Sequence, residues 1–227
     1  CITTEISKGS SDQLEKVYSS ANWIVFVDPK VDLSFFYQDD SSKNLLIIHY
    51  GDQNSSASGY NAIISRHLDV DYYNFGFSGN AKGDPNMAEY ISGIDMSVFV
   101  YDYDHNAPTV EHLKNTHEQF YKIIREKNPE LPIILVSKPD TSIVGAEHQR
   151  RTVIMETFLN ARNAGDDNIY FIDGYSFFPS DIRKDCTVDG CHPNDMGMYY
   201  MAKSIGGMLK EIFKMKNPQI EIEHIDF

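Results

Sequence analysis

The sequence predicts an α/β protein built on one doubly wound parallel sheet. From residue 45 onward, short and nearly continuous apolar runs alternate with segments of helical period. Such runs are typical of parallel strands that are buried on both faces. Five strand–helix units of this kind follow one another, and a length of 227 residues suits one α/β domain with a short appendage.

The predicted strands are short and apolar, and they are separated by longer amphipathic segments. They are Leu45–Tyr50, Tyr72–Phe77, Ser97–Tyr103, Ile133–Ser137 and Ile169–Ile172.

Three helices are predicted between or after these strands. One begins after Thr109, a suitable N-cap, and has an apolar face at Val110, Leu113, His117, Phe120 and Ile124. A second covers Arg150 to Ala164. The last follows Asn194 as N-cap and has a stripe at Met198, Met201, Ile205, Met208 and Ile212. Methionines at helical spacing pack into cores, so this stripe predicts packing and not a metal site.

Residues 1–44 are predicted to be an N-terminal extension, and residues 45–227 the main domain. Trp23–Val27 and Leu33–Tyr37 indicate two short strands around a turn at residues 28–30. Because about 44 residues cannot bury a core alone, we expect this extension to pack on the main domain.

The charge balance argues against two classes of partner. The 20 Lys and Arg residues and 33 Asp and Glu residues give a net charge of −13. A surface this acidic repels phosphate backbones and anionic lipids, so neither nucleic-acid nor membrane-surface binding is expected. No apolar run approaches the roughly 20 residues of a membrane helix, so no transmembrane segment is predicted.

The three cysteines bear on location and on loop structure. An exported lipoprotein begins with a lipidated cysteine, and polar residues follow Cys1. We therefore expect an extracytoplasmic or cell-surface protein, with Cys1 as a candidate lipid anchor; the alternative is that Cys1 has no such role. Cys186 and Cys191 bracket a loop short enough for a disulfide, and reduced thiols are the alternative. Only His192 lies nearby, which disfavours zinc.

The loop before the last helix contains a pair suited to acid–base chemistry. Asp189 and His192 form an Asp-x-x-His pair. This spacing lets the carboxylate hold one imidazole nitrogen while the other faces a cleft, as a general base in acyl transfer requires. The alternative is a helix-capping loop that contains a histidine by chance.

Two further residues at strand ends could stabilise an oxyanion. Gly79 could offer its backbone N–H and Asn106 its side-chain amide. Taken singly, Gly79 could be a turn glycine and Asn106 a turn former before Pro108. The carboxyl ends of parallel strands meet along one edge, so the order Gly79, Asn106, Asp189, His192 favours one site there.

These segments resemble blocks of the SGNH (GDSL-type) esterase family. Residues 74–80 look like its second block, Asn106 falls where its third carries Asn, and residues 187–197 look like its last. The resemblance covers about residues 45–213. It implies a flavodoxin-like three-layer α/β/α sandwich with a five-stranded parallel sheet, and removal of acyl groups, often acetyl, without a metal or other cofactor. It also implies that Gly79 and Asn106 are oxyanion donors, His192 the base and Asp189 its orienter.

The first block departs from the family pattern. The family places its serine one or two residues past the glycine that ends the first strand, but Gln53 follows Gly51-Asp52 here. The chain between Tyr50 and Tyr60 is also short by about six residues in the turn that would present a nucleophile. Either a segment with the serine is absent there, or the remaining candidates are Ser55, Ser56 and Ser58.

Three functional hypotheses follow. The first is a serine esterase that removes acyl groups, chiefly acetyl, from a carbohydrate or a related small ester. The second is a catalytically inactive relative that keeps a ligand-binding cleft. The third is a flavodoxin-like cofactor binder or metal enzyme that uses Asp102, Asp104 and His105. The third is disfavoured because no glycine-rich phosphate loop follows the first strand.

Overall fold

The computed structural model describes residues 46–51, 58–77, 79–139 and 145–216, together with the backbone at residues 15–16 and 26–27. Backbone contacts divide the chain into two units, Cys1–Ser42 and Lys43–Phe227. In the first unit, β1 (Glu15–Lys16) pairs antiparallel with β2 (Phe26–Val27).

The N-terminal predictions are tested only in part by this unit. Strand β2 falls inside the predicted strand Trp23–Val27, and its partner β1 was not predicted. The predicted strand Leu33–Tyr37 and the residue Cys1 lie outside the described residues. The packing of residues 1–44 on the main domain stays a prediction.

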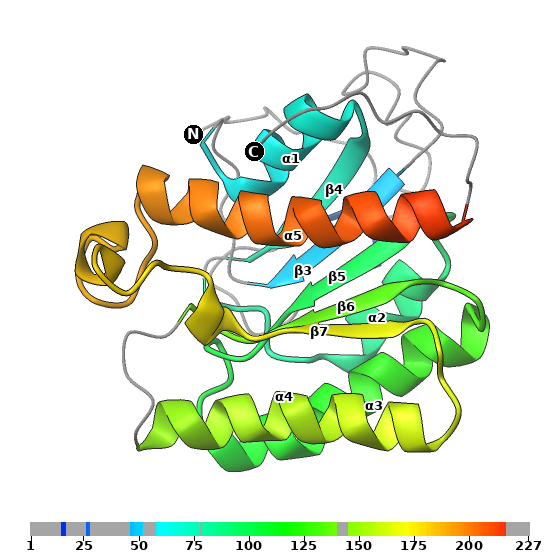
Figure 1. Cartoon of the computed structure of the whole chain (residues 1–227). Coiled ribbons are helices and arrows are strands. Elements are labelled where there is room, and N and C mark those ends of the chain that lie inside the picture. Colours follow the sequence, from blue (N-terminus) through cyan, green and yellow to red (C-terminus); the bar gives the residue numbers. More distant parts are fainter. Residues whose placement is uncertain are drawn as a thin grey trace. The chain divides into compact units, whose positions relative to one another are not determined.

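The second unit contains one parallel sheet of five strands (Figure 1). The strands are β3 (Leu46–Gly51), β4 (Asp71–Gly76), β5 (Val98–Asp102), β6 (Ile133–Val136) and β7 (Ile169–Ile172). Their order is β4-β3-β5-β6-β7, which is the 2-1-3-4-5 order of flavodoxin-like folds. The predicted fold class is therefore confirmed, and each predicted strand overlaps an observed one.

Helices cover both faces of this sheet (Figure 1). Helices α1 (Tyr60–Leu68) and α5 (Asp195–Lys216) pack together on one face. Helices α2 (Pro85–Ser92), α3 (Val110–Lys127) and α4 (Ala146–Asn163) pack in series on the other. None of the helices in the described part of the chain is both long and apolar enough to cross a bilayer.

The helix boundaries agree with the predicted caps. The Thr109 hydroxyl accepts from the amide of His112 at 3.0 Å, and Asn194 Oδ1 accepts from the amide of Gly197 at 3.1 Å. Helix α4 begins four residues earlier than predicted. Helix α2 was not predicted, although Asp84 as N-cap and Pro85 at the first helical position are ordinary signals of a helix start.

The methionine stripe of α5 packs against the core, as predicted. Met201, Ile205 and Ile212 are buried, and Met198 and Met208 are partly buried against the same core cluster. Each fully buried side chain of this size contributes roughly 1.5–3 kcal/mol to folding. This burial fixes α5, and with it the loop immediately before the helix.

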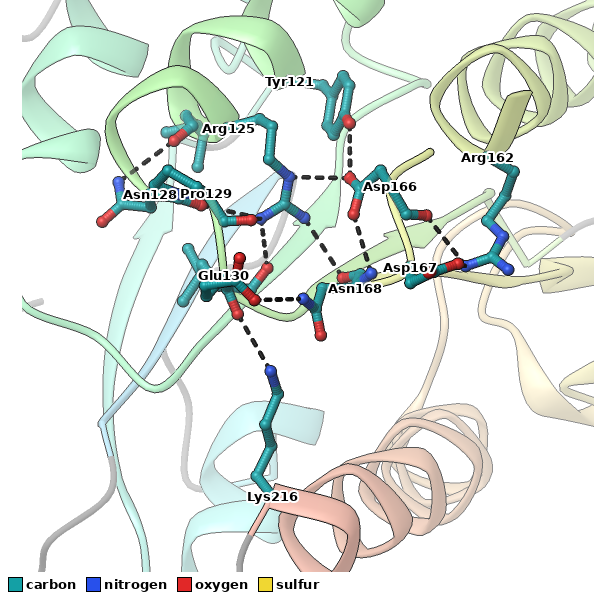
Figure 2. A network of polar contacts seen from close by, with 12 residues as sticks. Tyr121, Arg125, Asn128, Pro129, Glu130, Arg162, Asp166, Asp167, Asn168 and Lys216 are labelled. Carbon is teal, nitrogen blue, oxygen red and sulfur yellow. Dashed lines mark hydrogen bonds and ion pairs between the residues drawn. The ribbon is translucent and has the colours of Figure 1, made fainter. Parts of the chain in front are cut away.

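A polar network locks the edge of the sheet where β6 and β7 begin (Figure 2). Arg125 of α3 donates through Nε to Asp166 Oδ2 at 2.8 Å. Its terminal nitrogens donate to four backbone carbonyls in the two turns before these strands: those of Asn128, Pro129, Leu131 and Asn168. The side chains of Arg125 and Asp166 are only 15% and 9% exposed. This edge is therefore held together away from the carboxyl ends of the strands.

Candidate active site

The loop that carries Asp189 and His192 is closed by its own hydrogen bonds. Thr187 and Pro193 form an antiparallel bridge across its base, and the amide of Val188 donates to the carbonyl of His192 at 2.9 Å. The loop leads directly into α5, whose burial anchors it. A short segment of this kind can hold side chains in place although it lies at the surface.

Within this loop, Asp189 holds the imidazole of His192. Asp189 Oδ2 lies 2.6 Å from His192 Nδ1. The other carboxylate oxygen accepts from the backbone amides of His192 at 2.8 Å and Cys191 at 2.9 Å. Hydrogen bonds from the His192 amide and imidazole, and then from the Cys191 amide, lower the pKa of Asp189 to about 2. The carboxylate therefore stays ionised at neutral pH and directs the Nδ1 proton towards itself, so Nε2 is left for proton transfer.

Asn106 lies in a rigidly held loop between β5 and α3. Arg150 of α4 is buried and donates to the carbonyl oxygens of Asp104 at 2.6 Å and Ala107 at 2.8 Å. Asp104 Oδ2 accepts from the amide of Lys138, just after β6, at 2.8 Å. Asp104 and Ala107, on either side of Asn106, are thus fixed by groups from other elements, which limits how far Asn106 can move.

A contact between side chains joins these two loops. The Sγ atom of Cys191 lies 3.3 Å from Nε2 of His105. Cys191 immediately precedes His192, and His105 immediately precedes Asn106. Neighbouring Cα atoms are about 3.8 Å apart, so the contact brings the segments of His192 and Asn106 together at one edge of the sheet.

The same contact bears on the predicted disulfide. Cys186 and Cys191 are both free thiols in the structure. Cys186 is buried and its Sγ lies 3.5 Å from the carbonyl of Ile182, whereas the Cys191 thiol faces His105. The loop therefore keeps its shape here through hydrogen bonds and without a disulfide.

Gly79 lies in the turn at the carboxyl end of β4, next to β3 in the sheet. Its φ of +82° is in the left-handed region that favours glycine. The contacts described above join the loops of Asn106 and His192 and do not extend to Gly79. The catalytic roles of Gly79, Asn106, Asp189 and His192 stay predictions.

The serine block, which here means residues 50–60, begins at the end of β3, where Gly51 lies against Asp102 of β5. A Cβ atom on Gly51, the last residue of β3, would lie 2.2 Å from the carbonyl oxygen of Asp102, so this position requires glycine. Gln53, Ser55 and Ser56 lie outside the described residues. Ser58 is half-buried and immediately precedes Gly59, the N-cap residue of α1.

A buried network that the sequence analysis did not predict connects both ends of this block. The Tyr60 hydroxyl at the start of α1 donates to Asp102 Oδ2 at 2.9 Å and lies 3.0 Å from Nδ1 of His49. Burial lowers the pKa of His49 to about 3, so its imidazole is neutral. Because the hydroxyl has a single proton, His49 must donate its Nδ1 proton to the Tyr60 oxygen. A histidine inside an apolar strand, two residues before Gly51, was the available signal.

Each residue proposed for a metal or cofactor site makes a contact with another element of the fold. Asp102 accepts from Tyr60, Asp104 accepts from the Lys138 amide, and His105 contacts Cys191. Throughout the described ranges, no group of three or more His, Cys, Asp or Glu side chains is arranged to hold a metal ion. The geometry therefore gives no support to the third hypothesis.

An apolar groove of about 520 Å³ lies elsewhere in the second unit. Leu131, Ile212 and Phe213 contribute to its lining, beside the start of β6 and the C-terminal part of α5. The groove thus opens at the amino ends of the strands, whereas His192 and Asn106 follow carboxyl ends. Ligands of doubly wound sheets bind at the carboxyl ends, so the loops and not the groove form the candidate site.

Comparisons with solved structures reveal proteins of the same fold. A protein from Bacteroides ovatus ATCC 8483 described as a GDSL-like lipase is 28% identical, with a TM-score of 0.67, and the match covers 76% of this chain and 54% of that one. A salicylyl-acyltransferase from a tetracycline biosynthetic pathway is 19% identical, with a TM-score of 0.64 and coverages of 76% and 56%. This chain therefore spans little more than half the length of each. A family two carbohydrate esterase from Clostridium thermocellum, in complex with cellohexaose, is 16% identical, with a TM-score of 0.57 and coverages of 78% and 66%.

A search of curated proteins gave no significant match. The family model for GDSL-like lipases and acylhydrolases matches residues 47–210, which include the five strands of the sheet except Leu46 and both loops of the candidate site. This chain belongs to the GDSL-like lipase/acylhydrolase family.

Proposed function

We propose that the protein is a serine esterase of the SGNH type that removes acyl groups, chiefly acetyl, from a carbohydrate or a related small ester. The observation that carries this proposal is the Asp189–His192 pair, with 2.6 Å between Oδ2 and Nδ1. Two backbone amides fix the carboxylate, so the imidazole has one orientation available for proton transfer. Structural neighbours support the substrate class: one carbohydrate esterase binds cellohexaose, and another neighbour is an acetyl xylan esterase.

The mechanism uses the chain's own groups. A serine hydroxyl attacks the ester carbonyl carbon while His192 Nε2 takes its proton, and Asp189 stabilises the resulting imidazolium. The Asn106 amide and the Gly79 N–H donate to the tetrahedral oxyanion. The imidazolium then protonates the departing alcohol, and the serine is left acylated. Water, deprotonated by His192, releases the acid and restores the serine. The nucleophile is Ser55, Ser56 or Ser58, or a serine of a segment that is absent between Tyr50 and Tyr60.

Turnover of p-nitrophenyl acetate by the full chain tests the reaction. His192→Ala should lower kcat/KM by at least about 10³-fold. Asp189→Asn should lower it by about 10²-fold, because a carboxamide does not stabilise the imidazolium and exposure to water moderates the loss. His148→Ala, a change to an exposed histidine on α4, is the matched control and should leave the rate unchanged. Equal rates for the parent and His192→Ala would contradict the proposal.

Substrate class is tested by acetate release from acetylated xylan oligosaccharides, compared with p-nitrophenyl esters of longer acids. Faster turnover of the acetylated sugars is expected. Exclusive turnover of long-chain esters would refute the carbohydrate assignment and leave the esterase assignment intact.

One observation favours a second candidate function, a catalytically inactive relative that keeps the site for binding. Gln53 stands where the family serine would fall, and a carboxamide cannot attack an ester. A fluorophosphonate probe followed by peptide mapping separates the two candidates. Labelling of a serine between residues 52 and 58 establishes the esterase. Binding of an acetylated oligosaccharide without labelling or turnover establishes the inactive relative.

A further inference from the structure

The loop that carries Asn106 is held by other elements of the fold, whereas the loop that carries His192 is closed mainly by its own hydrogen bonds. Arg150 of α4 and the amide of Lys138, at the end of β6, fix the Asn106 loop. Apart from the contact of the Cys191 side chain, the hydrogen bonds given above for residues 187–193 stay within that loop. Catalysis of acyl transfer requires a base and an oxyanion donor at a fixed separation, so the Asn106 loop and the His192 loop must be joined.

The side chain of Cys191 makes this connection through His105. The distance from Sγ to Nε2 is 3.3 Å, within the range for a hydrogen bond that involves sulfur. Cys191 is half-buried, and on the other side of the His105 ring Nδ1 lies 3.8 Å from Oε2 of Glu147, which is close for a charge but beyond hydrogen-bond distance. Glu147 itself pairs with Lys138 Nζ at 3.3 Å.

The protonation states suit a thiol donor and an imidazole acceptor. Burial raises the pKa of the Cys191 thiol, although Lys138 nearby opposes this, so the thiol keeps its proton at neutral pH. The Glu147 carboxylate favours the His105 tautomer with the proton on Nδ1, which leaves Nε2 as an acceptor. Cys191 is therefore a structural thiol and not a thiolate nucleophile.

We infer that Cys191 and His105 are positioning residues whose contact holds His192 at a fixed separation from Asn106. This inference rests on the proposed function, because only an esterase needs His192 and Asn106 at a fixed separation. A change in this separation should lower kcat and leave KM nearly unchanged, since the oxyanion that Asn106 stabilises exists only in the transition state.

The test compares Cys191→Ala, which removes the donor, with Cys191→Ser, which keeps one. With p-nitrophenyl acetate, Cys191→Ala should lower kcat about tenfold at constant KM, and Cys191→Ser should restore most of the rate. Val188→Ala is the matched control, because Val188 lies in the same loop and the residue is 76% exposed. A Cys191→Ala variant with the parent's kcat, or a Cys191→Ser variant as slow as Cys191→Ala, overturns the inference.

A second measurement does not depend on activity. The ¹⁵N heteronuclear NOE of the His192 amide reports backbone motion on the picosecond-to-nanosecond timescale. It should fall in Cys191→Ala and in His105→Ala, and stay at the parent's value in Cys191→Ser and Val188→Ala. If the parent protein shows no turnover but the four variants show these NOE values, the proposed esterase is refuted and the connection between the loops is retained. An unchanged NOE in Cys191→Ala and His105→Ala would refute the connection, whatever the activity.

Discussion

Replacement of Tyr60 by phenylalanine tests whether the buried network holds the two ends of the serine block together. The substitution removes one oxygen atom and retains the ring, which packs against His49 with 4.5 Å between centroids. The hydroxyl contacts two groups, Asp102 Oδ2 at 2.9 Å and His49 Nδ1 at 3.0 Å. Tyr60 and His49 are almost completely buried, so water cannot readily replace the lost contacts.

The expected loss of stability follows from these two contacts. A hydrogen bond to a carboxylate contributes about 1.5–3 kcal/mol, and one between neutral groups about 0.5–1.5 kcal/mol. Among the described residues, His49 Nε2 already has no hydrogen-bond partner, so the variant would bury an imidazole with neither nitrogen satisfied. Tyr60→Phe should therefore lower the free energy of unfolding by about 2–4 kcal/mol.

Urea denaturation followed by far-UV circular dichroism measures this loss. With an m-value near 2 kcal/mol/M, the midpoint should shift by about 1–2 M. Tyr199→Phe is the matched control, because Tyr199 is 39% exposed on α5 and loses the same atom to solvent. Equal midpoints for Tyr60→Phe and Tyr199→Phe would refute the reasoning that the hydrogen bonds of Tyr60 stabilise the fold around the serine block.

Two other predictions concern the pH dependence of stability and the Arg125 network where β6 and β7 begin. Burial lowers the pKa of His49 and His117 to about 3 and raises that of Asp104 to about 6. Between about pH 4 and 6 the unfolded chain therefore binds about one proton more than the folded chain. The free energy of unfolding, measured by urea denaturation, should fall by about 1.4 kcal/mol for each pH unit that the pH decreases. A higher free energy of unfolding at pH 5 than at pH 6 would contradict this. Arg125→Met should lower the free energy of unfolding by about 3–5 kcal/mol, because it removes the cation beside the Asp166 carboxylate, which is 9% exposed, and the donor to four backbone carbonyls. Lys122→Met, at the surface pair with Glu118, should change it by under about 1 kcal/mol. Equal losses for the two variants would count against the network in Figure 2.

The fold could be predicted from the sequence because its signals are local. The β-strands of the parallel sheet are nearly continuous apolar runs, interrupted chiefly in β4 by Asp71 and Asn74. The caps Thr109 and Asn194 are single residues with a known preference. The predictions that failed or were missing concern short elements. Strand β1 has two residues of no apolar pattern, and α2 spans eight residues, too few for a clear period.

The site could be predicted only where its residues are close in sequence. Asp189 and His192 are three residues apart, so a single turn brings them together. The contact between His105 and Cys191 spans 86 positions, and the contact between Tyr60 and Asp102 spans 42. Pairs so distant depend on strand order and loop conformation, which a local pattern does not contain. The family resemblance supplied the order of the strand ends but not these contacts.

The exposure of the Asp189–His192 pair is compatible with the role proposed for it. The strongest pKa shifts of imidazoles in the described structure belong to His49 and His117, which burial makes neutral and weakly basic. A base with a pKa near 3 would accept a serine proton poorly, since a general base works best near the operating pH. His192 is 61% exposed and is oriented by hydrogen bonds and not by burial. The buried imidazoles and the apolar groove therefore belong to the framework of the protein, whereas the hydrogen bonds of the surface loops orient the residues of the candidate site.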